Sequence, residues 1–154
     1  MTIRVFAYGS NLCLERIAER APSARAVAVG VLAGHSLRWH KRGRDGSGKC
    51  DAFATGDPHD LVHGVVYEMT GADKAALDRV EGLDVHYFEK PVTIQQKEGG
   101  FLDAVTYVAN PLRIDAALLP TREYKTWVTT GARQHDLPPA WIATLEATPT
   151  LDEK

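Results

Sequence analysis

Two features of the sequence could carry out chemistry without a cofactor. The first is the string Tyr8-Gly9-Ser10-Asn11-Leu12, which lies where a predicted strand gives way to a predicted helix. Backbone N–H groups at such a junction have no partner inside the helix, so they can bind an anion or a developing oxyanion. The second is Glu81, at the end of a predicted helix and just before Gly82. The negative end of the helix dipole disfavours a carboxylate there, which fits a catalytic acid/base and an ordinary surface glutamate equally well.

A covalent nucleophile is disfavoured. Ser10 follows a strand, but its surroundings do not match the Gly-x-Ser-x-Gly elbow of the α/β-hydrolases. Cys13 lies between two leucines on a predicted helix and is expected to be buried, as cysteine commonly is. Cys50 borders a glycine-rich segment and could be exposed, but the sequence places no histidine or acid to activate it.

Metal and phosphate sites are also disfavoured. His59 and His63 have helical spacing for a metal site, but they fall on a predicted turn and strand. The segment Arg42–Lys49 contains three glycines without the spacing of a phosphate-binding loop. Its composition predicts a mobile flap whose ordering depends on a ligand. The basic run Lys41-Arg42-x-Arg44 is interpreted as part of a solvated loop, and attraction of a carboxylate-bearing substrate by the basic residues of Arg42–Lys49 is the alternative.

Hydrophobic periodicity supplies the elements that would position these residues. A Thr-x-x-acid capping box at Thr70 predicts a helix that Gly82 ends, and Ser10 or Asn11 is expected to cap the first helix. The strands are expected at 2–8, 26–32, 37–41, 51–55, 61–69, 87–96 and 101–108, and the other helices at 12–21, past Pro120 to Gly131, and from Pro138 through Leu145. This order predicts an α+β fold: a small mixed β-barrel or curled sheet flanked by three to four helices. One domain is expected over residues 1–148, followed by a frayed tail at 149–154.

Composition restricts the classes of partner. The chain has 154 residues, with 18 Lys and Arg against 20 Asp and Glu, for a net charge of −2. This balance predicts no nucleic-acid or membrane-surface partner. Neither a signal segment nor a membrane-spanning run is evident, and two cysteines are too few for a disulfide framework. A cytoplasmic protein is expected.

The string Tyr8–Leu12 and the string around Glu81, Leu77–Gly82, together resemble those of the γ-glutamylcyclotransferase family. The likeness runs from about residue 3 to 148, and the Tyr-Gly-Ser-Asn-Leu and Leu-Asp-x-x-Glu-Gly strings are specific as a pair. The matching segments are Phe6–Leu12, Glu15–Ile17, Pro22–Ala24, Val62–Tyr67, Leu77–Gly82, Tyr87, Tyr124–Lys125 and Gly131–Pro138.

The resemblance implies a reaction and a set of site residues. The family's barrel carries a cavity in which the free α-amine of a γ-glutamyl amide attacks the γ-carbonyl, releasing 5-oxoproline and an amine or amino acid. It implies that Glu81 is the general acid/base, that Tyr8, Gly9, Ser10, Asn11 and Leu12 hold the glutamyl group, and that Tyr87 and Tyr124 line the cavity. No metal or cofactor is implied.

Several alternatives stay open at this level. The segment Cys50–Thr55 departs from the glycine pair that some members carry, which leaves the exact substrate undecided. A cyclotransferase acting on a γ-glutamyl amine or on a γ-glutamyl-protected intermediate, and a non-catalytic barrel that binds a small metabolite, are the other hypotheses. The amides of Gly9–Asn11 could serve as an oxyanion hole or bind the α-carboxylate. The expected partner is a small γ-glutamyl molecule, and assembly into a homodimer is left open.

Overall fold

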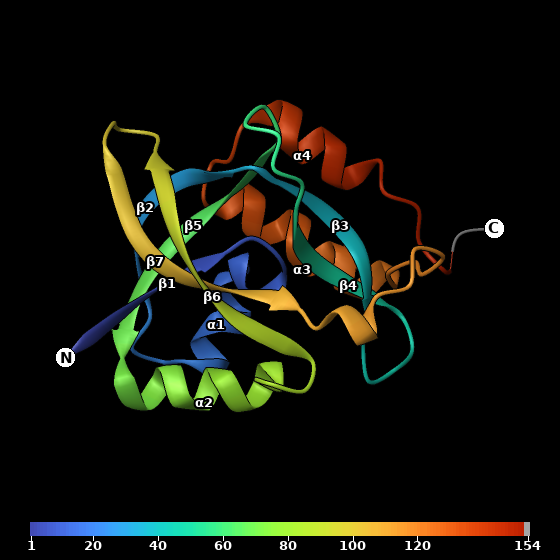
Figure 1. Ribbon diagram of the computed structural model, residues 1–154, viewed down its shortest axis with the longest axis horizontal. Helices are drawn as coiled ribbons and strands as arrows, with labels where there is room; N and C mark the ends of the chain where they lie inside the picture. The colour runs from blue at the N-terminus through green and yellow to red at the C-terminus, as the bar shows by residue number, and fades with distance from the viewer. Residues whose placement is uncertain (153–154) are drawn as a thin grey trace.

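The computed structural model describes residues 1–152 and combines one closed barrel with a separate hairpin and four α-helices (Figure 1). No helix within those residues is long and apolar enough to cross a membrane. The elements, in chain order, are β1 (Thr2–Ala7), η1 (Ser10–Leu12), α1 (Leu14–Arg20), β2 (Arg25–Ala33), β3 (His35–Arg42), β4 (Gly48–Ala54), β5 (Leu61–Thr70), α2 (Gly71–Glu81), β6 (Tyr87–Gln96), β7 (Phe101–Ala109), η2 (Pro111–Arg113), α3 (Arg122–Gln134) and α4 (Pro139–Glu146).

The barrel closes in the order β1-β5-β2-β6-β7. Its neighbours pair antiparallel except β1 and β7, which run parallel and meet where Val5 pairs with Val105. The hairpin β3–β4 forms a second sheet outside this ladder. Figure 1 shows α2 along one side of the barrel and α3 and α4 on the opposite side. The predicted α+β fold with a small barrel and flanking helices is therefore confirmed.

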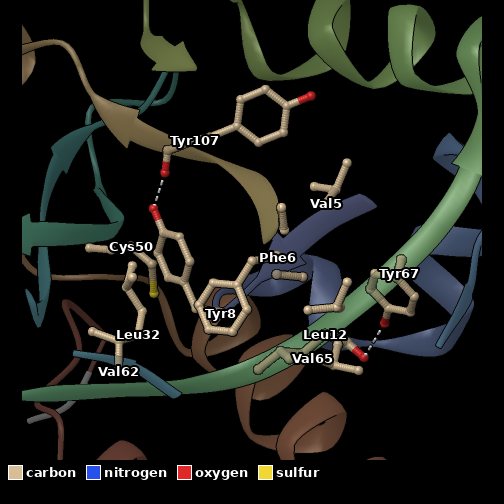
Figure 2. Packing of buried hydrophobic residues seen from close by; sticks show 14 of the residues in the cluster. Val5, Phe6, Tyr8, Leu12, Leu32, Cys50, Val62, Val65, Tyr67 and Tyr107 are labelled. Atoms are coloured by element: carbon tan, nitrogen blue, oxygen red, sulfur yellow. Dashed lines mark hydrogen bonds between the residues drawn. The ribbon is translucent and has the colours of Figure 1, made fainter. Parts of the chain in front are cut away.

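Apolar side chains from β1 and β5 fill the barrel together with a few tyrosines (Figure 2). Val5 and Val65 are almost fully buried, as β-branched residues on an inward face should be. The buried tyrosines find acceptors for their hydroxyls: Tyr8 donates to the carbonyl of Tyr107, and Tyr67 donates to the carbonyl of Leu12 at 3.1 Å. These hydrogen bonds connect strands β7 and β5 to the segment that follows β1.

The first helix begins later than the sequence predicts. Residues Ser10–Leu12 form one turn of 3₁₀-helix, and α1 starts at Leu14, with Cys13 as its N-terminal cap and no side-chain capping bond. Neither Ser10 nor Asn11 caps α1, since the side chain of each is engaged elsewhere. By contrast, the hydroxyl of Thr70 accepts from the Asp73 amide at the start of α2, as the capping box predicts.

The glycine-rich segment is a hairpin turn rather than the long flap expected from its composition. Strand pairing continues to Arg42 and resumes at Gly48. Between them, the Asp45 carboxylate accepts from the amide and the hydroxyl of Ser47 at 2.9 and 2.7 Å. The Gly48 amide donates to the carbonyl of Leu119 at 2.8 Å, which attaches the turn to the chain before α3. These bonds define the shape of the turn.

The end of the chain is attached to the fold through residue 152, in contrast to the frayed tail expected from 149. Thr150 is buried, and the amide of Leu151 donates to the carbonyl of Pro120 at 3.0 Å. The carboxylate of Asp152 accepts from the Arg122 amide, where α3 begins. Residues 153 and 154, also part of the expected tail, lie outside the described residues.

Candidate active site

The segment Gly9–Asn11 presents backbone donors at the mouth of the barrel. In η1 the amides of Leu12 and Cys13 donate to the carbonyls of Gly9 and Ser10, each at 3.1 Å. The amides that precede them have no acceptor within this turn, as at any helix start. Because η1 is a single turn, its dipole contributes little, so the N–H groups themselves are the feature that could bind an oxygen.

Helix α3 fixes the position of this segment. A Cβ atom at Gly131 would lie only 2.3 Å from the backbone of Leu12 and Cys13, so the close approach requires glycine. The carbonyl of Leu12 is also hydrogen-bonded to His135 Nε2 at 2.9 Å, with the hydroxyl of Tyr67 nearby. The segment therefore rests on rigid helical and barrel elements, which a binding site of defined geometry requires.

Helix α2 places the carboxylate of Glu81 next to the Gly9–Asn11 segment. It is the last residue of α2, and Gly82 ends the helix in the left-handed conformation with φ of 67°. Its Oε1 accepts a hydrogen bond from Asn11 Nδ2 at 2.8 Å and lies 3.5 Å from Arg20 Nη1. The same Arg20 nitrogen donates to Asn11 Oδ1 at 2.8 Å. Asn11 and Arg20 thus fix one carboxylate oxygen, and they offset the unfavourable position of an acid at a helix C-terminus.

The other carboxylate oxygen of Glu81 is available for a substrate. Within residues 1–152, Oε2 makes no hydrogen bond or ion pair. The side chain is 15% exposed, so it is neither sealed in the core nor free in solvent. A carboxylate fixed by one oxygen and open at the other can take up and return a proton with little rearrangement.

Three buried tyrosines complete the walls. The hydroxyl of Tyr87 donates to the carbonyl of Cys50 at 2.9 Å, and the Cys50 amide donates to the hydroxyl of Tyr124 at 3.0 Å. Burial raises the pKa of Tyr8, Tyr87 and Tyr124 well above the usual value for a phenol. These hydroxyls therefore stay neutral, and they serve as hydrogen-bonding and packing groups rather than as bases.

The residues predicted for the site meet at two connected cavities. The inner cavity, of about 50 Å³, is lined by Tyr8, Gly9, Ser10, Asn11, Glu81, Tyr87 and Tyr124, together with barrel residues. An outer cavity of about 260 Å³ shares Ser10, Glu81, Tyr87 and Tyr124 with it and opens toward the β3–β4 turn. The inner cavity thus joins backbone donors, one carboxylate and neutral phenols, and the outer one leads away from that carboxylate.

The geometry differs from the expectation for Leu12, and it settles the exposure of Cys50. Leu12 does not line either cavity, since its side chain is fully buried beneath α3. Cys50 lines the inner cavity but is buried rather than exposed. Burial raises the pKa of its thiol far above the ordinary value, so the sulfur is not a thiolate near neutral pH.

Several cations that the sequence did not point to surround the site. Arg16 and Arg20 lie four residues apart on α1, and both line the outer cavity. The guanidinium of Arg16 lies 3.7 Å from the centre of the Trp127 ring and donates to the hydroxyl of Ser10. The four-residue spacing of the two arginines is present in the sequence, but charged residues on one helix face usually indicate a solvated surface and not a binding site.

The two histidines considered for a metal have separate environments. His59 is exposed beside Asp57, and the His63 ring packs 4.8 Å from that of Trp141. Residues 1–152 contain no group of three or more potential metal ligands.

The protein is a closed five-stranded barrel in which one carboxylate and a backbone segment with free amides line the same small cavity. The model of the AIG2-like family matches residues 61–145. Gamma-glutamylcyclotransferase from Bos taurus is 32% identical over 137 residues, covering 86% of this chain and 71% of that protein. The human protein of the same name is 31% identical over 146 residues, covering 92% and 76%. A solved structure titled gamma-glutamyl cyclotransferase superposes with a TM-score of 0.90 at 28% identity, covering 100% of this chain and 92% of the other.

The chain therefore belongs to the AIG2-like family and, within it, to the γ-glutamylcyclotransferases.

Proposed function

We propose that this protein is a γ-glutamylcyclotransferase in which Glu81 is the general acid/base. The α-amine nitrogen of a γ-glutamyl amide attacks the γ-carbonyl carbon and forms a five-membered ring. The amide C–N bond breaks, and the products are 5-oxoproline and a free amine. The attacking ammonium loses two protons as it becomes the ring amide, and the leaving nitrogen gains two as it departs as an ammonium. A single carboxylate can carry them one after the other, without water or an enzyme nucleophile.

One observation carries this proposal. Glu81 and the amides of Gly9–Asn11 face the same cavity, and Asn11 Nδ2 lies 2.8 Å from the carboxylate. A glutamyl group bound there would have donors for an oxygen on one side and a proton acceptor on the other. Positioned proton transfer typically contributes about 10²–10⁴-fold to a rate, and holding the amine at the carbonyl adds a further entropic contribution.

The remaining wall groups suit the same substrate. Neutral Tyr87 and Tyr124 can pack against the glutamyl carbons without competing for the proton. Both hydroxyls are tied to the backbone of Cys50, so the cavity keeps its shape. We further propose that the reaction takes place in the cytoplasm, because Cys13 and Cys50 are both free thiols.

Release of 5-oxoproline from a panel of γ-glutamyl compounds tests this function. The panel should include γ-glutamyl amino acids, γ-glutamyl amines and glutathione, with 5-oxoproline and the freed amine both quantified. Equimolar appearance of the two products from at least one compound is expected. Binding of these compounds without any 5-oxoproline would instead indicate a metabolite-binding barrel and refute the proposed activity.

A further inference from the structure

Lys41 is a buried cation without an anionic partner. The residue is only 4% exposed, yet it lines the outer cavity. Its ammonium group donates to His86 Nδ1 at 2.8 Å and lies 4.8 Å from the centre of the Tyr87 ring. Within residues 1–152 no carboxylate forms an ion pair with it. Buried charges are ordinarily paired, so this arrangement requires an explanation.

The strand geometry brings Lys41 inside. Successive residues of a regular strand face opposite sides, yet His40 and Lys41 are both buried. The β3–β4 pairing shifts register between Arg38 and Lys41, and such an irregularity redirects the side chains that follow it. The fold thus turns a lysine inward that regular alternation would leave in solvent.

The partner of Lys41 does not neutralise it. Burial lowers the pKa of His86, and the positive charges of Lys41, Arg113 and Arg44 lower it further, so the imidazole is neutral at pH 7. A neutral imidazole accepts the hydrogen bond but supplies no negative charge.

The carboxylate of Glu81 attracts the ammonium group of Lys41 from a distance, without forming an ion pair, and so favours its charged form. The positive charges of Arg113, Arg44 and Lys49 repel the ammonium and disfavour that form.

The other cations of the outer cavity are mostly engaged. Arg20 contacts Asn11 and Glu81, and Lys49 pairs with Asp45 at 3.3 Å. Arg44 has only a long hydrogen bond of 3.4 Å to a backbone carbonyl, that of Val80. Arg16 stacks on the Trp127 ring and donates to the Ser10 hydroxyl, so it has no carboxylate partner among the described residues either. Of the three cations of this cavity without such a partner, Arg16, Lys41 and Arg44, only Lys41 is buried.

The position of Lys41 indicates which part of a ligand would meet it. Lys41 lines the outer cavity and not the inner one, and Glu81 is shared by both. If the glutamyl group occupies the inner cavity, as the proposed function requires, the leaving nitrogen lies near Glu81. The substituent on that nitrogen then extends into the outer cavity, toward Lys41.

We propose that Lys41, assisted by Arg44, binds a carboxylate on the leaving group and so selects γ-glutamyl amino acids or peptides over γ-glutamyl amines. This inference rests on the proposed function. It makes Lys41 a specificity-determining residue, one that acts on the departing half of the substrate.

A pair of substrates that differ in one charge tests the inference. γ-Glutamyl-alanine carries a carboxylate on its leaving group, and γ-glutamyl-alaninamide replaces it by a neutral amide. The wild-type protein is expected to have a kcat/KM about 10- to 100-fold higher for the acid, the size of one charge-assisted hydrogen bond. Lys41→Gln should reduce that preference by about tenfold or more, mainly through KM for the acid, while Lys41→Arg should keep most of it.

A matched control is Lys90→Gln. Lys90 also donates to a histidine ring nitrogen, His35 Nε2 at 2.8 Å, but lines neither cavity. The control should keep the full preference for the acid. Because the preference is a ratio of two rates on one sample, a partly unfolded variant still reports it.

The outcomes separate this inference from the proposed function. Equal wild-type kcat/KM values for acid and amide would overturn the assignment of Lys41 and leave the cyclotransferase activity standing. An equal loss on both substrates in Lys41→Gln would also overturn it, since Lys41 would then act on the glutamyl half. Absence of 5-oxoproline from both substrates with the wild-type protein would refute the proposed function itself.

Discussion

Replacing Glu81 by glutamine removes the proposed proton acceptor and keeps the shape of the side chain. Glutamine Oε1 can still accept from Asn11 Nδ2, which lies 2.8 Å from the native carboxylate. It cannot carry a proton from the substrate's ammonium to the leaving nitrogen. We expect kcat to fall by about 10²–10⁴-fold, which corresponds to roughly 2.7–5.5 kcal/mol of activation free energy.

Stability should change little in the same variant, because two effects oppose each other. The ion pair with Arg20, at 3.5 Å and with side chains 18% and 15% exposed, is worth at most about 1 kcal/mol. Removing a carboxylate from the C-terminus of α2 returns about 0.3–1 kcal/mol. The melting temperature should therefore stay within about 4 °C of the wild-type value.

Release of 5-oxoproline under saturating substrate, together with a thermal unfolding curve, measures both quantities. Glu68→Gln is a matched control, since Glu68 is 17% exposed and pairs with Arg4 and Arg25 outside both cavities. That variant should keep its kcat. If Glu81→Gln turns over at more than about a tenth of the wild-type rate, the carboxylate is not the proton carrier and the mechanism is wrong.

Three further predictions concern the walls of the site. Gly9→Val should raise KM by roughly tenfold or more in steady-state assays, because the added Cβ lies 3.1 Å from that of Cys50 and the branches reach further into the cavity. Gly131→Ala should lower the free energy of unfolding by about 1–3 kcal/mol in urea titrations, because its Cβ would lie 2.3 Å from the Cys13 amide nitrogen. Burial lowers the pKa of Lys41 to about 8. The preference for γ-glutamyl-alanine over its amide should therefore be nearly complete at pH 7, fall to about half near pH 8 and be largely lost by pH 9, as the ammonium loses its charge.

Each of these predictions has a result that contradicts it. An unchanged KM in Gly9→Val would show that the substrate does not approach this segment. For Gly131→Ala the comparison is Gly71→Ala, where the added Cβ meets nothing within 4 Å and stability should not fall. Equal losses in the two alanine variants would refute the packing argument. A preference that is constant from pH 7 to 9 would show that Lys41 does not supply the charge.

Local signals account for what the sequence predicted well. The capping box at Thr70, the left-handed Gly82 and the β6–β7 hairpin depend on residues close together in the chain, and each is present. The sequence did not distinguish a closed barrel from a curled sheet. The barrel closes through the parallel contact between β1 and β7, which joins Val5 to Val105, 100 positions away. No local pattern encodes such a pairing.

For the candidate site, too, residues with a local sequence signal were predicted, and residues that depend on long-range packing were not. Glu81 and the string at Gly9 were predicted to lie together through the family resemblance, and both line the inner cavity. Arg20 was missed, since its contact with Glu81 depends on how α1 and α2 meet in space. Lys41 was missed because a basic run beside glycines is typical of a solvated loop, and an irregular strand register turned it inward.

The separate sheet formed by β3 and β4 has a consequence for how such enzymes diverge. The Gly9–Asn11 segment follows barrel strand β1, and Glu81 ends the helix that follows barrel strand β5, whereas Lys41 and Arg44 lie on a hairpin that shares no ladder with the barrel. Substitutions in that hairpin can change which amine departs while the ring-closing machinery stays intact. Substrate preference should therefore evolve faster than the reaction itself, and exchanging residues 41–49 between relatives is a direct route to new selectivity while Cys50 and the inner cavity are kept.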